Sequence, residues 1–344
     1  MITPTENLPA VTETDAGVFG DPDRFRRELV ERCQPIVIRG AFSGWPVVRA
    51  ASVSTEALHG YLARFATTAS AEAFVGEPSI AGRYTYAEGL DGFNFERVQT
   101  DLLGALDRIV ASAAQPGSPS VYMGSLETDI YLPGFSAENR VAVLPSSVSP
   151  RIWIGNASVV SCHNDTFDNI ACAVAGRRRF TLYPPDAIGD LYIGPIDYTM
   201  SGRPISLAAG SDPGDPRYPR FAAAAPRASV ADLAPGDALY LPKLWWHQVE
   251  ASEPFNILVN YWWDAASVGP DAPYTTMLLA MIAIAERPPA ERAAWRSLFD
   301  HYVFRPDGHP LAHLPEARHG ILGPLRGGNY GRIRALVMQL LRGG

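Results

Sequence analysis

Between residues 119 and 263 the chain consists of short runs rich in β-branched and aromatic residues, separated by Gly, Pro, Asn and Asp. Eight such runs are SVYMGS, RIWIGNASVV, NIACAVAG, RRFTLYPP, ASVADL, DALYLP, WHQVEA and FNILVNYWW. Repeated short strands with turn residues between them are typical of a β-sandwich or barrel, not of alternating strands and helices. The sequence therefore predicts a mainly β core over 119–265, with PGD at 235–237 leading into a strand and ASEP at 251–254 forming a hairpin turn.

The segments around this core have a different character. Residues 1–118 predict a flank of helices and strands that packs on the core, with helices over 22–33 and near 54–65 and 98–113 and a strand in PIVIRG. Residues 192–226 form an insertion rich in Pro, Gly and Tyr and without clear periodicity. Because long irregular segments inside a compact domain are usually functional or mobile, we expect this insertion to cover the mouth of the barrel.

The last segment, residues 266–344, predicts helices. Near its end, apolar residues recur at the spacing of one helix face, namely Ile333, Leu336, Val337, Leu340 and Leu341. Two interpretations of this stripe remain open. It packs on the barrel, or it forms the interface of a homodimer.

Composition narrows the class of protein. A net charge of -7 without long runs of one sign disfavours binding to nucleic acid through bulk phosphate attraction. Three cysteines, Cys33, Cys162 and Cys172, do not make a disulfide framework or a CxxC zinc site, which favours a reducing compartment. The first residues lack the pattern of a signal peptide, and the longest apolar run, at 277–285, is too short to span a bilayer, so we expect a cytoplasmic protein without a membrane segment.

The stretch SCHNDTFDN, residues 161–169, is the first candidate for chemistry. In an extended chain His163 and Asp165 point to the same side, so they form either a polar surface turn or two ligands of a metal. The best third ligand is His247 in LYLPKLWWHQVEA, where an unpartnered polar ring would be costly to bury. Cys162 should face the opposite side. The remaining histidines lie in predicted helices or polar loops: His59, His301, His309, His313 and His319.

Two histidines and one carboxylate are the ligand set of non-heme Fe(II) oxygenases, which leaves coordination positions open for a co-substrate and dioxygen. Zinc would prefer a closed tetrahedral site, or three ligands and one water. The motifs WIGNASVVSCHNDTFDNIACAVAGRRRFTLYPP, PGDALYLPKLWWHQVEA and LVNYWW resemble the cupin-like JmjC family of Fe(II)- and 2-oxoglutarate-dependent oxygenases. The resemblance runs from about Pro35 to Trp263, and the closest likeness is to the asparaginyl hydroxylase that acts on hypoxia-inducible factor.

This resemblance implies a double-stranded β-helix, or jelly roll, with Fe(II) held by His163, Asp165 and His247. It also implies that the far carboxylate of 2-oxoglutarate meets a basic residue, usually Lys, at the position of Arg178. Strand alternation turns Arg178 inward and its neighbours Arg177 and Arg179 outward. The alternative is that all three arginines are solvated at a sheet edge.

The same resemblance assigns three further residues to the co-substrate shell. Tyr122 would reach the far carboxylate, while Asn169 and Asn260 would lie near the iron. For Asn260 the alternative is an amide that bonds to neighbouring backbone. The chain departs from the family at Val160, where a Thr that binds the co-substrate is common, and at Gly124, where the asparaginyl hydroxylase has a Gln that contacts substrate.

The predicted function is a hydroxylase that couples oxidative decarboxylation of 2-oxoglutarate to succinate with hydroxylation of a C–H bond. Its prime substrate stays open among a protein side chain, a peptide, a sugar and a small metabolite. The alternatives are a metal-only cupin enzyme such as an isomerase, a non-catalytic metal-binding module, and an oxygenase that modifies tRNA. Lys243, the only lysine beside 28 arginines, is expected at the rim, either solvated or in contact with an anionic substrate.

Overall fold

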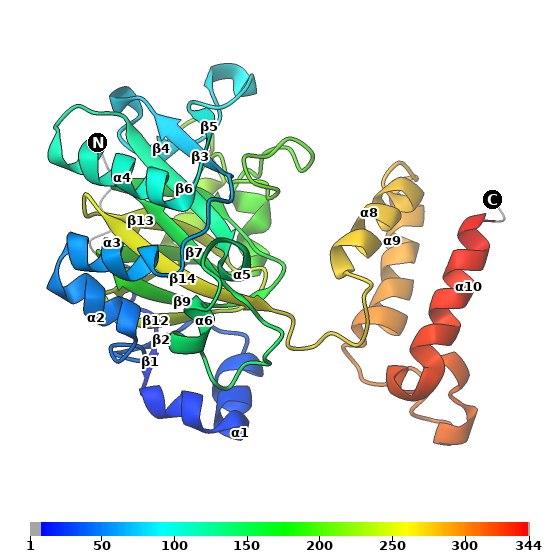
Figure 1. The fold of residues 1–344 in the computed structure, drawn as a ribbon. Helices are drawn as coiled ribbons and strands as arrows, with labels where there is room; N and C mark the ends of the chain where they lie inside the picture. Colours follow the sequence, from blue (N-terminus) through cyan, green and yellow to red (C-terminus); the bar gives the residue numbers. More distant parts are fainter. Residues whose placement is uncertain (1–7, 343–344) are drawn as a thin grey trace. The chain divides into compact units, whose positions relative to one another are not determined.

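The computed structural model describes residues 8–342, and its contacts divide the chain into two compact units, Met1–Asp264 and Ala265–Gly344 (Figure 1). The first unit contains every described strand and the second is helical.

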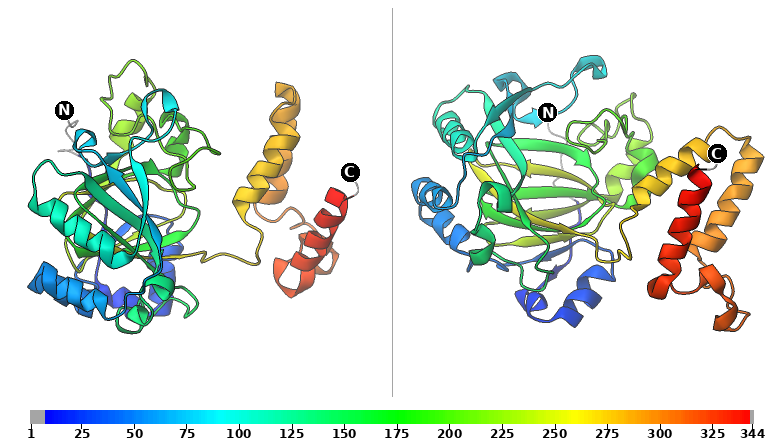
Figure 2. Two further views of the ribbon diagram at one scale, coloured as in Figure 1. Left: turned by 45° about the horizontal axis from the view of Figure 1, so that its top comes forward. Right: turned by 45° about the vertical axis from the view of Figure 1, so that its right-hand side comes forward.

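Two β-sheets face each other in the first unit (Figures 1 and 2). The larger sheet has the strand order β1-β2-β12-β9-β14-β7-β6-β3-β5, and the smaller has the order β11-β10-β13-β8-β4. The strands are β1 (Glu13–Thr14), β2 (Ile36–Ile38), β3 (Ala71–Gly76), β4 (Arg83–Tyr84), β5 (Glu96–Thr100), β6 (Ser120–Glu127), β7 (Pro150–Gly155), β8 (Ser158–His163), β9 (Asp168–Ala175), β10 (Arg178–Tyr183), β11 (Ser229–Leu233), β12 (Ala238–Leu241), β13 (Trp246–Ala251) and β14 (Asn256–Trp263).

The space between the sheets is filled by apolar side chains from both of them. The smaller sheet contributes Phe180, Leu182 and Val249, and the larger contributes Leu239, Leu241 and Leu258. Burying a side chain of this size stabilises the fold by roughly 1.5–3 kcal/mol. The predicted mainly β, jelly-roll core with flanking helices is therefore confirmed.

Helices cover the outer face of the larger sheet, where a second apolar cluster lies. They are α1 (Pro22–Phe25), which continues as a π-helical turn to Val30, α2 (Pro46–Val53), α3 (Thr55–Ala63), α4 (Leu102–Ala114), α5 (Thr128–Tyr131) and α6 (Phe135–Glu138). Ser54 caps α3 through the N–H of Ala57, and Asp101 caps α4 through the N–H of Gly104. The helix expected from residue 98 thus begins only after Asp101, because residues 96–100 form β5. Helix α2 was not predicted, although Pro46 marks its first turn.

Two predictions about the strands were wrong. RIWIGNASVV is not one strand, because a turn at 156–157 separates β7 in the larger sheet from β8 in the smaller. ASEP does not close a hairpin either, since β13 pairs with β8 and β10 whereas β14 pairs with β7 and β9. Both turns carry the chain from one sheet to the other, and turn residues alone do not distinguish such a crossing from a hairpin.

The insertion at 192–226 is mostly irregular, with one short helix, α7 (Phe221–Ala224). Part of it lies beside the end of β8, where Ile205 bridges to His163 and the N–H of Ser206 donates to the carbonyl of Cys162 at 2.7 Å. On the outer face of the smaller sheet, Cys162 packs against apolar residues of the insertion and its flanks, including Phe221. Cys162 thus points away from the barrel interior, as predicted.

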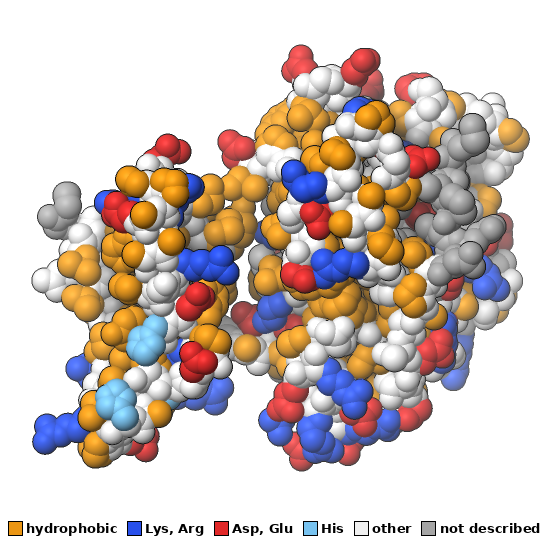
Figure 3. Space-filling view, turned by 180° about the vertical axis from the view of Figure 1, so that it is seen from behind, with side chains coloured by type: hydrophobic (Ala, Val, Ile, Leu, Met, Phe, Trp, Pro, Cys, Tyr) orange, Lys and Arg blue, Asp and Glu red, His pale blue; other side chains and the backbone are white. Residues whose placement is uncertain are grey.

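The second unit consists of α8 (Pro273–Ile284), α9 (Pro289–Phe299), which ends in a π-helical turn to Phe304, and α10 (Tyr330–Arg342). None of the described residues of these three helices is buried. Hydrophobic side chains are frequent on the surface of this second unit (Figure 3). Among the described helices of the protein, none has the length and apolar character needed to cross a bilayer.

Candidate active site

Three side chains from two neighbouring strands and one loop converge at one end of the barrel. His163 ends β8 and lies directly opposite His247 on β13, with ring centroids 4.3 Å apart. Asp165 follows β8 in the loop to β9, and its Oδ2 is 3.7 Å from Nε2 of His247. The potential ligand atoms of all three lie within 4.8 Å of one another, the single such group of metal-ligating side chains in residues 8–342.

Each imidazole is oriented by the main-chain carbonyl of the residue two positions earlier. Nδ1 of His163 lies 2.8 Å from the carbonyl of Ser161, and Nδ1 of His247 lies 3.0 Å from that of Trp245. A carbonyl only accepts, so each Nδ1 carries a proton, and in the neutral ring Nε2 is then the nitrogen that can bind a metal. Burial, reinforced by the neighbouring His163, lowers the pKa of His247 to about 4, so this ring is neutral at physiological pH.

Arg178, at the start of β10, is a buried cation inside the same barrel. It is 4% exposed, its Nε has no hydrogen-bond partner, and no described carboxylate forms an ion pair with it. Burial lowers its pKa to about 10, which still leaves it charged at pH 7. Its neighbour Arg179 instead pairs with Asp232 at 2.7 Å at the surface. A buried guanidinium without a counterion is costly, so this arrangement calls for an anionic ligand.

The other predicted shell residues are also placed inside the barrel. The side-chain amide of Asn260 donates to Oδ1 of Asn169 at 3.1 Å and accepts from Nε1 of Trp153 at 2.6 Å. Its recorded partners are thus side chains, in contrast to the alternative of a bond to the backbone. Tyr122 on β6 is buried, which raises the pKa of its hydroxyl and keeps it a protonated donor.

A family model described as "Cupin-like domain" matches residues 22–268, well over half of the chain. The chain belongs to the cupin-like domain family. Together with the two facing sheets, this assigns its first unit to a known jelly-roll fold.

Several curated proteins share this cupin-like domain. HSPB1-associated protein 1 of Bos taurus is 27% identical over 287 residues, which cover 79% of this chain and 57% of that protein. The bifunctional peptidase and (3S)-lysyl hydroxylase JMJD7 of Homo sapiens is 28% identical over 278 residues, 71% of this chain and 81% of that protein. Lysine-specific demethylase JMJ31 of Arabidopsis thaliana is 31% identical over 146 residues, 42% of this chain and 25% of that protein.

The chain thus spans little more than half the length of HSPB1-associated protein 1. The relatives include proteins named as a hydroxylase and a demethylase, which places the cupin-like domain among JmjC-type proteins. The finer likeness to an asparaginyl hydroxylase stays a prediction.

Trp153 on β7 contacts the predicted site residue Asn260 but is absent from the residues predicted from the sequence. A Cβ at position 124 would lie 2.6 Å from Cε3 of Trp153, so the indole ring fills the space that a side chain at Gly124 would need. Nε1 of the same indole donates a hydrogen bond to Oδ1 of Asn260. The signal that could have identified it is the pair of a Gly on β6 and a Trp on the neighbouring strand β7.

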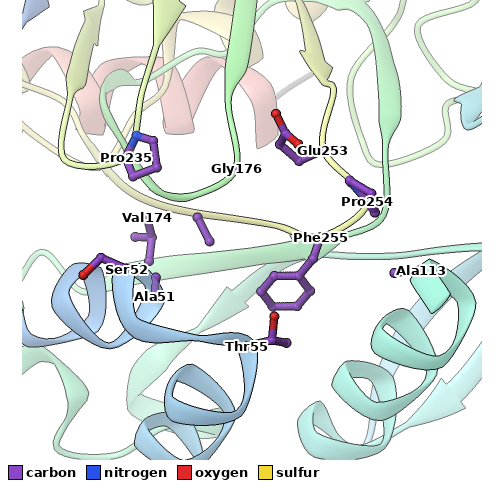
Figure 4. A pocket seen from close by; sticks show the side chains of 11 residues that line it. Ala51, Ser52, Thr55, Ala113, Val174, Gly176, Pro235, Glu253, Pro254 and Phe255 are labelled. Carbon is purple, nitrogen blue, oxygen red and sulfur yellow. The ribbon is translucent and has the colours of Figure 1, made fainter.

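A cavity of about 460 Å³ lies away from these residues, at the far end of β9 (Figure 4). Val174, Gly176 and Phe255 are among its lining residues, and Glu253 is its one charged residue. Its lining includes no member of the His–Asp–His group and no predicted co-substrate residue, so it is separate from the candidate metal site.

Proposed function

We propose that the protein is an Fe(II)- and 2-oxoglutarate-dependent oxygenase that hydroxylates a C–H bond. The single observation that carries this proposal is the buried Arg178, which lacks an anionic partner among the described residues and lies in the same barrel as His163, Asp165 and His247. A metal-only cupin enzyme or a metal-binding module would have no use for this charge.

The residues present fit both groups. Two imidazole nitrogens and one carboxylate oxygen bind Fe(II) and leave positions open, whereas a structural zinc site would be closed by four ligands. His247 lies opposite Leu182 on β10. Arg178 precedes Leu182 by four residues, which puts roughly 13 Å of extended strand between their Cα atoms. A ligand that reaches from the metal toward Arg178 is therefore extended and acidic at its far end, as 2-oxoglutarate is.

Each side chain has a defined part in this proposal. Nε2 of His163, Nε2 of His247 and the Asp165 carboxylate hold the metal, and Arg178 binds the far carboxylate in a charge-assisted, bidentate geometry. Tyr122 donates a hydrogen bond to the same carboxylate, and the Asn169–Asn260 pair orients groups near the metal. With iron bound, the centre supplies activation of dioxygen coupled to decarboxylation of 2-oxoglutarate to succinate.

For the prime substrate we propose a protein side chain, because two of the relatives are named for reactions on lysine residues. Hydroxylation and demethylation differ only in where the oxidised carbon lies, so product analysis decides between them. The tRNA-modifying alternative is disfavoured by the net charge of -7.

The test is succinate release. Protein loaded anaerobically with Fe(II) and 2-oxoglutarate should release succinate when air is admitted, and His247→Ala should lower the rate by at least about a hundredfold because one metal ligand is lost. Normal succinate production by His247→Ala would refute the metal assignment. A wild type that binds Fe(II) but neither binds 2-oxoglutarate nor releases succinate would favour the metal-only alternative.

We also propose a homodimer in the cytoplasm. The described residues of α8 and α10 include exposed apolar side chains such as Ile282, 84% exposed, and Leu340, 67% exposed. In a symmetric dimer the same apolar surface of a second copy would cover them. The three cysteines are free, which agrees with a reducing compartment.

A further inference from the structure

The only lysine of the chain lies between two carboxylates next to the metal-ligand segments. Nζ of Lys243 is 3.2 Å from Oδ2 of Asp168 and 2.5 Å from Oδ1 of Asp264. Asp168 is 3% exposed and also accepts a hydrogen bond from the hydroxyl of Tyr240 at 3.1 Å. Of the two alternatives for Lys243, a solvated rim residue is therefore wrong, because two protein carboxylates already match its charge.

This ion pair joins the two segments that carry the ligands. Asp168 begins β9 and closes the short loop 164–167 that contains Asp165. Lys243 lies in the turn 242–245, between β12 and the strand β13 that carries His247. A contact between Lys243 and Asp168 thus links the Asp165 loop to the turn that leads into His247.

A second bond joins the same two segments beside the ion pair. The N–H of Leu244 donates to the main-chain carbonyl of Asp165 at 2.7 Å. To do so, Leu244 adopts a left-handed backbone with φ of 68° while its side chain stays 45% exposed. A leucine in this region costs roughly 1–2 kcal/mol and persists only where neighbouring contacts hold it. Lys243, the preceding residue, supplies such a contact.

Asp165 needs this support more than the two histidines do. His163 and His247 lie on paired strands, whereas Asp165 lies in a loop beyond the end of β8. We propose that Lys243 and Asp168 form a positioning pair that holds the Asp165 carboxylate in the geometry needed for metal binding. This inference rests on the proposed function, because it assumes that the three residues bind a metal.

The residue type supports this assignment. The chain uses Arg at 28 of its 29 strongly basic positions and Lys only here. A compact ammonium with three donors can bind two carboxylates that approach from different segments, whereas a planar guanidinium presents its donors in one fixed plane. Substitution by Arg therefore keeps the charge but fits the position less well.

The first experiment measures Co²⁺ binding to the metal-free protein by visible absorption, in the absence of oxygen and co-substrate. Lys243→Met and Asp168→Asn should each weaken Co²⁺ binding about tenfold, as expected for residues that support metal ligands. The double variant should lose no more than either single one, since both substitutions remove the same pair. Lys243→Arg should recover binding to within about threefold of wild type.

Arg39 provides the matched control. Arg39 follows β2 and also bridges two carboxylates, Glu13 at 2.6 Å and Asp237 at 2.8 Å, neither of which lies in the segments that carry the metal ligands. Arg39→Met should lower the melting temperature to a similar extent as Lys243→Met and leave Co²⁺ affinity and the Co²⁺ spectrum unchanged. Equal Co²⁺ affinities of Lys243→Met and Arg39→Met, or additive losses in the double variant, would overturn the positioning pair.

The outcome for the wild type separates this inference from the proposed function. A wild type that does not bind Co²⁺ would overturn both. A wild type that binds Co²⁺, with no difference in Lys243→Met, would overturn only the inference.

A single lysine also allows a direct chemical readout. Acylation by an amine-specific reagent, located by mass spectrometry, reports on Lys243 without interference from other lysine side chains. Because Asp168 holds the ammonium, Asp168→Asn should increase acylation at Lys243 by about threefold or more, as loss of one charged hydrogen bond implies. Unchanged acylation would contradict the contact itself.

Discussion

Among single residues, two consecutive arginines, Arg178 and Arg179, differ in environment because they point to opposite faces of strand β10. Arg179 pairs with Asp232 at the surface, whereas Arg178 is buried without a described counterion. Alternation along the strand predicted that the two side chains face opposite sides, and the burial of Phe180 and Leu182 shows that Arg178 is on the inner side.

Arg178→Met should raise the KM for 2-oxoglutarate by about 10- to 100-fold, because a charged hydrogen-bonded contact contributes roughly 1.5–3 kcal/mol. Arg179→Met is the matched control, since it removes a neighbouring arginine from the outer face and should leave this KM within about twofold of wild type. Steady-state succinate assays measure both. Equal KM values for the two variants would show that another residue binds the far carboxylate of 2-oxoglutarate.

His247 predicts how the stability of the metal-free protein depends on pH. Its pKa is about 4 in the folded chain and 6.5 in the unfolded chain, so between these values the unfolded chain binds the extra proton. The free energy of unfolding should therefore fall by about 2 kcal/mol from pH 7 to pH 5 through this group alone. Urea unfolding at both pH values measures it. In His247→Gln the free energy of unfolding should fall less between pH 7 and pH 5. A fall equal to that of wild type would show that other groups are responsible.

At the scale of elements, the insertion at 192–226 is tied to the segment that carries the ligands. Arg203 donates through Nε to the carbonyl of Asn164 at 2.8 Å and through its terminal nitrogen to the side chain of Asn164 at 2.7 Å. Asn164 lies between His163 and Asp165, so the insertion and the Asp165 loop support each other.

Arg203→Met should loosen the insertion near Tyr198, whose side chain is 42% exposed. Limited chymotrypsin digestion should therefore cleave after Tyr198 at least about threefold faster than in wild type, because local opening follows the loss of tertiary contacts. Arg217→Met is the control, since the recorded ion pair of Arg217 is with Asp215 inside the insertion. Similar rates in both variants would show that the tie to Asn164 does not hold the insertion.

At the scale of the whole molecule, the two units differ in how they bury apolar residues. The first has apolar clusters between and outside its sheets, whereas apolar side chains of α8, α9 and α10 stay exposed. An apolar surface of this kind is typical of a binding interface.

The double variant Ile282→Glu/Leu340→Glu should convert the proposed dimer into a monomer in sedimentation velocity experiments, because buried unpaired carboxylates oppose association. Val53→Glu is the control, since Val53 is an exposed apolar residue, 76% exposed, in the first unit. A wild type that sediments as a monomer would refute the dimer. A double variant that stays dimeric would place the interface elsewhere.

The class of the fold and the three potential metal ligands could be predicted without the structure. Short β-branched and aromatic runs with turn residues between them predicted the strands, and the spacing of apolar residues predicted the helix near the C-terminus, because these signals depend on neighbours along the chain. The spacing of His163 and Asp165 and the motif around His247 identified a set of side chains that the structure brings within 4.8 Å.

The pairing of the strands and the contacts that support the site became known from the folded chain alone. The turns at 156–157 and 251–254 cross between sheets, although their residues also suit a hairpin. The contacts of Trp153 with Asn260 and of Lys243 with Asp168 join residues 107 and 75 positions apart. Such contacts depend on the register of strands in two sheets, for which local sequence carries no signal.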